Sequence, residues 1–528
     1  MVETFELMTI KQASDWASQY LRRDVTPSNI SYLIQYGRIK KVADNGNTLV
    51  NRRDLVNYYQ SYLGKREIDW KSRLGEDLIW TLSFDYLKES ERTKHVHRLH
   101  PYKGKFIPQL VEYFLDSHTD DFKKEVYFKR DDIILDPFAG SGTTLVQASE
   151  LGMHAVGIDV SSFNALISNV KINKYNLPEL FNEVSKITSA LRQFISHSNT
   201  QKFETNLIEA LTDFNNRHFP SPDFKIRARA GEVKEHEYGG AKAQEFEQIY
   251  KALIYIYEIE LKQQKDDTFL DKWYVKPIRQ EIDFVRTLIE QTQDTNIRNA
   301  LTIILSRTLR SCRATTHYDL ATLKEPVFST YYCHKHGKIC KPLFSIVNWW
   351  RRYSVDTIER LAQFDKLRTN ASQFCLAGDS RTIDIIKGLE THYPALAQIV
   401  RDRKIKGIFS SPPYVGLIDY HDQHAYAYEL FRFERKDHLE IGTLSNGQGF
   451  EARELYIHSI SESLNNCKRF LVNDYDIFLV ANDKYNLYPV IAEKSGMRIV
   501  KQYKRPVLCR TERDKGAYGE IIFHLKRV

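Results

Sequence analysis

Short apolar runs and amphipathic stretches alternate in two parts of the chain, a pattern typical of the strands and helices of an α/β fold. Residues 133–135 form an apolar run, residues 145–151 an amphipathic one, and residues 155–158 a second apolar run. The rhythm returns much later, with expected strands at residues 374–376, 405–409, 477–480, 498–503 and 520–525 and an expected helix at residues 489–495. The pattern therefore predicts one mixed sheet assembled from two separated segments.

Between these segments the apolar positions follow a helical period. Residues 177–195, 246–261 and 273–312 carry apolar residues three and four positions apart, whereas residues 227–242 are polar and favour a loop. The chain therefore predicts a large, mainly helical insertion at residues 176–368. It divides the α/β part into residues 65–175 and 369–528.

The first 64 residues predict a small domain of their own. Thr9 can cap one helix, Thr26 and Pro27 start a second, and Asn45-Gly46 is a strong hairpin signal before a last helix at residues 54–62. Helix, helix, hairpin and helix resembles the excisionase-type winged helix, which presents its second helix to a DNA groove. The resemblance implies base contacts from Ser28, Asn29, Ser31 and Tyr32 and phosphate contacts from Arg38, Lys40, Lys41, Arg52 and Arg53. A protein-docking module is the alternative.

Composition adds a preference for a nucleic-acid partner. The 528 residues have a net charge of +8 with 31 Tyr and 28 Phe, and basic side chains meet phosphates while aromatic rings stack on bases. Six scattered Cys do not suggest a disulfide framework, and the N-terminal MVETFELMTI lacks the basic segment and long apolar run expected of a signal sequence. No apolar stretch is long enough to span a bilayer. We expect a cytoplasmic protein with no membrane partner.

The turn at residues 136–144, DPFAGSGTT, follows the first apolar run directly. Gly140 and Gly142 let the backbone bend sharply and approach a ligand, and Thr143 starts the next helix. Asp159 ends the second run, where a carboxylate can accept hydrogen bonds from both hydroxyls of a ribose. The turn is not a dinucleotide-binding GxGxxG motif. Asp136 at its start suits a cationic ammonium, as in the methionine part of S-adenosylmethionine, better than a pyrophosphate.

This turn has a companion motif, Ser410-Ser411-Pro412-Pro413-Tyr414, after the strand at residues 405–409. The pair resembles the S-adenosylmethionine-dependent DNA amino-methyltransferases, which modify cytosine N4 or adenine N6. The resemblance covers roughly residues 95–175 and 370–528, and it implies a Rossmann-like class I methyltransferase sheet with S-adenosylmethionine as cofactor. It implies a loop that closes over the methionine end and an acid near the adenine amine, so that the expected cofactor residues are His100, Tyr102, Lys105, Phe106, Asp136, Pro137, Phe138, Gly140, Ser141, Gly142, Thr143, Asp159, Asp379, Ser380 and Ser410.

Ser411, Pro412, Pro413 and Tyr414 are the expected catalytic residues. An exocyclic amine is a poor nucleophile because its lone pair is delocalised into the ring. Two acceptors for its hydrogens, Ser411 Oγ and the Pro412 carbonyl, favour the pyramidal nitrogen that attacks the methyl group. Tyr414 can stack on a flipped base. Ser at the first motif position mostly accompanies cytosine N4 methylation in the resembled family, and Asp or Asn accompanies adenine N6.

The insertion is the expected target-recognition region, because the resembled family places its most variable part within the core. Basic and aromatic residues at its end suit DNA contact, and we expect this role for Arg313, Thr315, His317 and Tyr318, together with Tyr420 and His421 beyond the insertion. Cys333, His336 and Cys340 could supply three zinc ligands, but no clear fourth ligand stands near them in the sequence, which therefore predicts no metal site.

We therefore expect a DNA methyltransferase that acts on cytosine N4 in double-stranded DNA, the modification arm of a restriction system with a separately encoded endonuclease. Adenine N6 methylation of DNA, methylation of an RNA base, and sequence-specific DNA binding without catalysis are the alternatives. A fused nuclease is a further one, because Asp223, Glu232 and Lys234 imitate the spacing of a Mg²⁺-dependent nuclease. Their neighbours are not the apolar strands that this chemistry requires.

Overall fold

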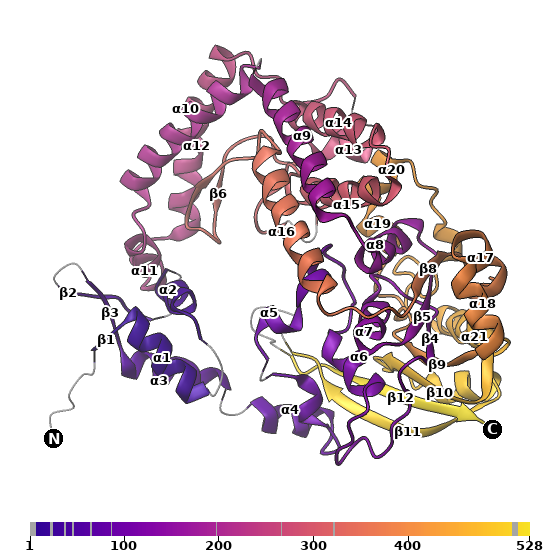
Figure 1. The fold of residues 1–528 in the computed structure, drawn as a ribbon. Helices are drawn as coiled ribbons and strands as arrows, with labels where there is room; N and C mark the ends of the chain where they lie inside the picture. The colour runs from indigo at the N-terminus through magenta and orange to yellow at the C-terminus, as the bar shows by residue number, and fades with distance from the viewer. Residues whose placement is uncertain are drawn as a thin grey trace, which may run out of the picture.

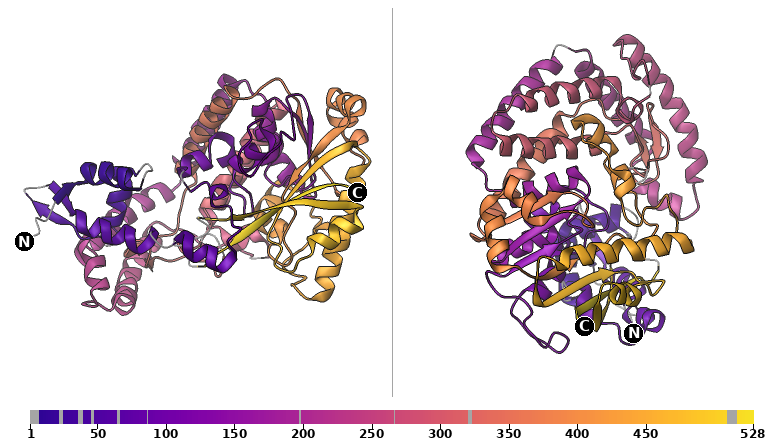
Figure 2. Two further views of the ribbon diagram at one scale, coloured as in Figure 1. Left: turned by 90° about the horizontal axis from the view of Figure 1, so that it is seen from below. Right: turned by 90° about the vertical axis from the view of Figure 1, so that its right-hand side faces the viewer.

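The computed structural model describes residues 7–21, 25–35, 39–44, 47–63, 66–85, 87–196, 198–265, 267–319, 323–508 and 516–528. The N-terminal elements, the α/β sheet and the helical insertion occupy three regions of the molecule (Figure 1). The N-terminal elements project from one side, and the insertion arches over the edge of the sheet (Figure 2). No helix in the described ranges has the length and apolar character needed to cross a membrane.

The N-terminal elements follow the expected order. Helices α1 (Ile10–Leu21), α2 (Pro27–Gln35) and α3 (Arg52–Leu63) surround a three-stranded antiparallel sheet of β1 (Leu7–Thr9), β3 (Asn47–Asn51) and β2 (Val42–Asp44). Ala13, Ala17, Ile30, Val50 and Leu55 are fully buried and form a hydrophobic core separate from those of the rest of the chain. The turn residues Asn45 and Gly46 lie outside the described residues. Whether this unit is a winged helix stays a prediction.

The central sheet has seven strands in the order β11-β12-β10-β9-β4-β5-β8. Strand β12 runs antiparallel to both of its neighbours, and the pairs from β10 through β8 are parallel. This mixed sheet is consistent with the class I methyltransferase fold expected from the sequence. The strands are β4 (Ile133–Asp136), β5 (His154–Asp159), β8 (Gln373–Ala377), β9 (Ile405–Ser410), β10 (Leu471–Ala481), β11 (Met497–Pro506) and β12 (Gly519–Arg527).

Alternation along the strands gives the sheet two hydrophobic faces. On β4, Ile134 belongs to one core and Ile133 and Leu135 to the other, because successive side chains point to opposite faces. The first core contains α6 (Pro108–Leu115), α7 (Thr143–Leu151) and α8 (Ser162–Ile172). The second contains α17 (Ile385–His392), α18 (Pro394–Arg403), α21 (Phe450–Lys468) and α22 (Tyr488–Lys494). Shorter elements complete this part: α4 (Arg66–Leu74), η1 (Trp80–Ser83), α5 (Glu89–Arg92), η2 (His95–Arg98), α19 (Tyr420–Gln423), α20 (Ala425–Phe431) and η3 (Asp437–Leu439).

The insertion leaves the sheet after α8 and returns to it at β8. Its elements are α9 (Leu177–Ser196), α10 (Thr200–His218), α11 (Asp223–Arg229), α12 (Glu235–Ile256), α13 (Phe269–Trp273), α14 (Lys276–Glu290), α15 (Thr295–Ser311), β6 (Tyr331–Cys333), β7 (Lys338–Cys340) and α16 (Val347–Asp365). Apolar residues of α9, α14 and α15 belong to the same core as α7 and α8. The hydrophobic core on this face of the sheet therefore continues into the insertion.

The prediction of a loop at residues 227–242 is wrong for most of this range. Residues 227–229 end α11 and residues 235–242 begin α12. The helix forms here although its sequence is polar, because the buried Phe246 and Tyr250 further along α12 anchor it. Asp223 and Glu232, the residues of the nuclease alternative, lie at a helix start and in a turn rather than on strands, and Glu232 pairs with Arg227 at 3.3 Å.

Candidate active site

The strands β4, β5, β8 and β9 end at one edge of the sheet, and a cavity opens there. The strand order reverses between β4 and β9, which is the usual ligand position in an open α/β sheet. The cavity is lined by Tyr102, Gly104, Lys105, Phe106, Pro137, Phe138, Ala139, Gly140, Ser141, Thr143, Asp159, Val160, Asn164, Asp379, Ser380, Ser411, Pro413, Tyr420, Leu439, Glu440 and Ile441. Most residues expected to hold the cofactor are therefore brought together.

Four of those residues do not line the cavity: His100, Asp136, Gly142 and Ser410. His100 is buried, and its Nε2 lies 2.9 Å from Ser306 Oγ on α15. This contact fixes the loop before α6 against the insertion. Gly142 adopts a φ of 75°, and a Cβ there would lie 2.8 Å from Ser168 Oγ, so glycine is needed for the close packing of α7 and α8. These two residues shape the site from behind the cavity wall.

Gly140 faces the loop that was expected to close over the cofactor. Its φ is 50°, and a Cβ there would lie 2.9 Å from the hydroxyl of Tyr102. Only glycine lets the turn approach this ring so closely. Next to it, Ser141 Oγ is buried and has no hydrogen-bond partner among the residues that the structure describes. Asn164 Oδ1, in the same cavity wall, also lacks a partner among the described residues, and two such oxygens fit a bound ligand with polar groups of its own.

Asp159 holds the glycine-rich turn from the neighbouring strand. Its Oδ2 accepts a hydrogen bond from the backbone N–H of Gly140 at 2.8 Å, and its Oδ1 accepts from the backbone N–H of Ser161 at 2.9 Å and from Asn164 Nδ2 at 3.1 Å. Burial raises the pKa of Asp159 to about 7, although these three donors favour the charged form. The carboxyl is therefore poised to change charge near neutral pH.

Asp136 joins the two sequence motifs. Ser410 donates a hydrogen bond from Oγ to Asp136 Oδ1 at 2.6 Å, and the Phe138 backbone N–H donates to the same oxygen at 3.2 Å. Burial raises the pKa of Asp136 to about 6, while the Ser410 hydroxyl acts in the opposite direction. The side chain is 1% exposed and lies behind the cavity wall. Contact with a ligand ammonium, expected from the sequence, stays a prediction.

Two lysines lie beside the glycine-rich turn and the cavity. Lys105 lines the cavity, and its Nζ donates to the carbonyl of His97 at 2.8 Å. Burial lowers the pKa of Lys105 to about 8. Lys171 is fully buried on α8, and its Nζ donates to the carbonyl of Ser141 at 2.5 Å. Lys171, which has no counterpart among the residues expected from the sequence, therefore supports the turn from below.

Asp379 and Ser380 line the cavity after β8. The Asp379 carboxylate is held by the guanidinium of Arg381, whose Nη2 lies 2.8 Å from Asp379 Oδ2. The orientation of the acid is therefore set in advance.

Ser411 and Pro413 line the same cavity, whereas Pro412 and Tyr414 are not among its lining residues. The Tyr414 hydroxyl donates to Glu520 Oε1 on β12 at 2.8 Å. Glu520 in turn faces the buried guanidinium of Arg505 on β11, with Nη1 3.7 Å from Oε2. Burial raises the pKa of Tyr414 well above its usual value, so the phenol stays protonated. The last two strands thereby orient the motif.

The residues expected to contact DNA occupy different surroundings. Ser28, Asn29, Lys40 and Arg52 are exposed, and Asn29 Oδ1 also caps α2 by accepting from the Thr26 backbone N–H at 2.8 Å. Arg38 and the side chain of Tyr32 lie outside the described residues. Arg313 and Thr315 are buried, and Tyr318 is 79% exposed. Tyr420 lines the cavity, and His421 is buried against Glu440. DNA contact by these residues stays a prediction.

Sequence reasoning missed part of the cavity wall. Gly104, Asn164 and the run Leu439, Glu440 and Ile441 all line it. Glu440 is buried and accepts hydrogen bonds from the backbone N–H groups of Tyr420 at 3.1 Å and His421 at 2.7 Å. This run begins at the last residue of the short η3 and continues into the loop before α21, so no periodic pattern marks it. Asn164 could have been suggested by its position one turn after Asp159.

The comparisons with known proteins agree with this geometry. A family model for N6 and N4 methyltransferases, described as DNA methylase, matches residues 20–169. The type II methyltransferase M.MjaII of Methanocaldococcus jannaschii is 45% identical over 525 residues, which is 99% of this chain and 97% of that protein. Shorter matches include M.MvaI of Kocuria varians, 31% identical over 18% of this chain and 20% of that protein, and M2.LlaDCHI of Lactococcus lactis, 35% identical over 24% and 39%. Because one relative matches almost from end to end, the chain belongs to the type II DNA methyltransferases, whose methyl donor is S-adenosylmethionine.

Proposed function

We propose that this protein methylates the exocyclic N4 of cytosine in double-stranded DNA and that it is the modification enzyme of a restriction system. The observation that carries the proposal is the position of Ser411. Its side chain lines the same cavity as Asp159, Asp379 and Gly140. An amine placed at Ser411 would therefore lie in the space that also receives the methyl donor.

Ser411 and Pro412 prepare the target amine for attack. The Ser411 hydroxyl oxygen and the Pro412 carbonyl are acceptors for the two amine hydrogens, and this arrangement favours a pyramidal nitrogen with an available lone pair. Pro412 and Pro413 each have a fixed φ, so the carbonyl is aimed before the base arrives. Transfer itself then depends mainly on proximity and alignment.

The residues around the cavity fit S-adenosylmethionine. When bound, this cofactor supplies a sulfonium methyl group that an amine can take by in-line displacement. In our proposal Asp159 accepts hydrogen bonds from the ribose, Asp379 accepts one from the adenine amine, and the loop of Tyr102, Lys105 and Phe106 covers the methionine end. The buried Ser141 Oγ, which has no partner among the described residues, supports this fit.

The target base has to leave the DNA stack to reach Ser411, which costs a few kcal/mol of unstacking. Tyr414 is the aromatic residue that would offset part of this cost by stacking on the flipped base. The insertion and the N-terminal elements are the proposed DNA-binding parts. The N-terminal elements and the α11 end of the insertion lie at the same side of the molecule (Figures 1 and 2), so one duplex could meet both.

Adenine N6 is the second candidate, because the matching family model covers both N6 and N4 enzymes. The serine at position 411 favours cytosine in our proposal. Nucleoside mass spectrometry separates the two after the purified protein is incubated with methyl-labelled S-adenosylmethionine and mixed genomic DNA. N4-methylcytosine supports the proposal, whereas N6-methyladenine overturns the base assignment and leaves the mechanism in place.

Two controls complete this experiment. Ser411→Ala is expected to retain S-adenosylmethionine binding and to lose methyl transfer, by about 100-fold or more, because one preorganised acceptor is removed. A tRNA substrate run in parallel distinguishes DNA from RNA as the target. Product on tRNA without product on DNA would contradict the duplex assignment. A separately encoded endonuclease would be identified by its failure to cut DNA that this protein has methylated.

A further inference from the structure

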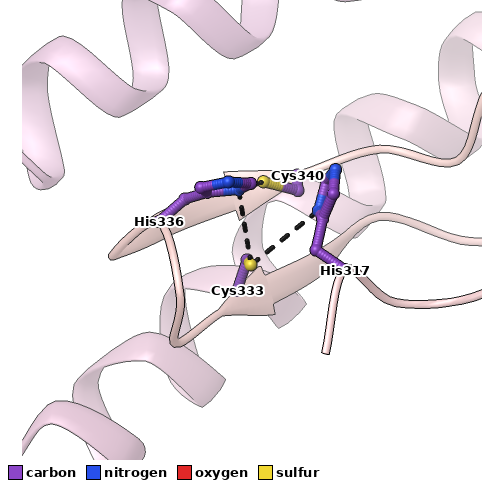
Figure 3. Close-up of side chains that lie close together, drawn as sticks. All are labelled: His317, Cys333, His336 and Cys340. Carbon is purple, nitrogen blue, oxygen red and sulfur yellow. Dashed lines mark hydrogen bonds between the residues drawn. The ribbon is translucent and has the colours of Figure 1, made fainter. Parts of the chain in front are cut away.

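Four side chains of the insertion converge on one point beside the hairpin of β6 and β7. Figure 3 shows Cys333 and Cys340 on the two strands, His336 in the turn between them, and His317 approaching from a separate segment. One ligand atom from each residue lies within 4.8 Å of the corresponding atom of every other. Both cysteines are buried and unpaired. The sequence pattern identified Cys333, His336 and Cys340 as possible ligands, and the fold adds His317 as the fourth.

The distances in this group match those around a tetrahedral metal. Cys333 Sγ lies 3.5 Å from His336 Nδ1 and 3.8 Å from His317 Nδ1, and Cys340 Sγ lies 3.5 Å from His336 Nδ1. Zinc bonds of about 2.3 Å to sulfur and about 2.0 Å to nitrogen at tetrahedral angles separate S and N ligands by about 3.5 Å. Three of the six edges of such a tetrahedron therefore already have about the expected length, and the other three are no longer than 4.8 Å.

Local structure holds each ligand in place. The Cys333 carbonyl accepts hydrogen bonds from the backbone N–H groups of His336 at 3.1 Å and Gly337 at 2.7 Å, and Gly337 has a φ of 65°. This tight turn carries His336 back toward both sulfur atoms. On the other segment, Thr316 Oγ1 accepts from the Asp319 backbone N–H at 3.1 Å, which closes the turn that presents His317.

From this geometry we propose that His317, Cys333, His336 and Cys340 form a structural zinc site. Two thiolates and two neutral imidazoles balance the charge of Zn²⁺ and fill all four positions, so no position is left for substrate or water. This assignment gives His317 a role other than the DNA contact expected from the sequence.

The site would add a link between two parts of the insertion. The hairpin packs on α12, where Tyr332 donates its hydroxyl to Glu235 Oε1 at 2.8 Å, and Lys225 of α11 donates to the His334 carbonyl at 2.5 Å. His317 lies six residues beyond the end of α15, the helix that contacts His100 near the cofactor cavity. Zinc would therefore fasten the outer arm of α11, α12 and the hairpin to the helix that reaches the active site.

Tyr331 contacts the His317 nitrogen that would bind zinc. Its hydroxyl lies 2.8 Å from His317 Nδ1 and accepts a hydrogen bond from the His317 backbone N–H at 3.1 Å. With zinc bound to His317 Nδ1, the Tyr331 hydroxyl still accepts the hydrogen bond from the His317 backbone N–H, but it no longer contacts Nδ1. Tyr331→Phe is therefore expected to retain zinc, and this variant separates the metal site from a hydrogen-bonded cluster that contains no metal.

The test measures metal in the full-length protein, purified under reducing conditions without chelators. Inductively coupled plasma mass spectrometry should find about one zinc per chain. Replacement of zinc by cobalt(II) should give the charge-transfer band of cobalt–thiolate bonds and the intense visible bands of tetrahedral cobalt. Cys340→Ser and His317→Asn should lose most of the bound zinc.

Matched controls make the result specific. His334→Asn changes a histidine of the same hairpin that is outside the group, and Cys467→Ala changes a buried cysteine of α21, so both should keep the zinc content of the wild type. Circular dichroism shows whether each variant folds. If a ligand variant does not fold, the cobalt spectrum of the wild-type protein still tests the proposal.

Three results would overturn the proposal. The first is wild-type protein with reduced thiols and no zinc that also fails to bind added cobalt. The second is a Cys333–Cys340 disulfide found by peptide mapping of protein prepared under those conditions. The third is zinc content unchanged in folded Cys340→Ser and His317→Asn variants.

Discussion

The Ser410 hydroxyl donates a hydrogen bond to Asp136 Oδ1 across 2.6 Å, and this contact joins residues 274 positions apart in the chain. Asp136 starts the glycine-rich turn, and Ser410 directly precedes Ser411. The two halves of the site are therefore fastened to each other beneath the cavity. Because both groups are buried, the bond contributes to stability as well as to alignment.

Ser410→Ala should destabilise the protein by about 1–3 kcal/mol, because it leaves a buried carboxyl without its closest partner. Methyl transfer should fall as well, since the backbone of Ser411 is no longer anchored. Thermal unfolding and single-turnover assays measure the two effects. Ser354→Ala is a matched control, because Ser354 Oγ is also buried but has no partner in the described part of the chain. Equal stability of the two variants would contradict the importance of the bond.

Cofactor affinity should depend on pH through Asp159. Its pKa is raised to about 7 in the folded protein, so the carboxyl is neutral below that pH and charged above it. Ribose hydroxyls donate better to the charged form, so affinity should rise with pH up to about 7 and then level off. Below that point the change should approach tenfold per pH unit, the effect of one linked proton.

Isothermal titration with S-adenosylhomocysteine between pH 5.5 and pH 8 measures this dependence. In Asp159→Asn the dependence should flatten, because the amide does not titrate. Because the pKa of Asp159 is higher in the folded than in the unfolded protein, ionisation of this carboxyl costs folding free energy. The contribution of Asp159 to stability therefore decreases as the pH rises from the pKa of the unfolded chain toward 7. An affinity that rises equally in wild type and Asp159→Asn would assign the effect to another group.

The ring and the hydroxyl of Tyr414 should contribute to the methyl-transfer rate to different extents. Tyr414→Ala removes the ring, which by analogy with base stacking is worth about 1–3 kcal/mol, and should nearly abolish methyl transfer while DNA binding is retained. Tyr414→Phe removes only the hydrogen bond to Glu520 and should lower the rate less. Single-turnover rates and DNA affinity distinguish the two. If Tyr414→Ala also abolished DNA binding, the ring would be a DNA-binding or structural element instead.

Lys40 and Lys41 should contact DNA phosphates. Each is exposed on the N-terminal elements, and each lost phosphate contact reduces the salt dependence of binding by about one unit of slope. Lys40→Gln with Lys41→Gln should therefore weaken binding on all DNA sequences and flatten the plot of log affinity against log salt. Lys387→Gln with Arg403→Gln is the control, because α17 and α18 lie on the opposite side of the molecule (Figure 1). An identical slope in both double variants would contradict DNA contact by the N-terminal elements.

The sequence by itself determined the elements and the two motifs. Apolar runs and helix caps are local signals, so β4, β5, β8, β9 and the helices beginning at Pro27, Pro108 and Thr143 lie where the pattern predicted them. Glycine and proline spacing likewise identified Gly140, Ser141, Ser411 and Pro413, which all line one cavity. Local sequence failed at residues 227–242, where the helix is stabilised by packing of a later apolar turn.

Only the tertiary structure decided which distant residues meet. The contact of Ser410 with Asp136, the support of Tyr414 by Glu520, and the entry of Glu440 into the cavity wall all join segments that no local pattern relates. His317 joins Cys333, His336 and Cys340 for the same reason, because a turn beyond α15 and a hairpin 16 residues away along the chain happen to close on one point. Periodicity records how each segment folds, whereas side-chain convergence depends on how the folded segments pack.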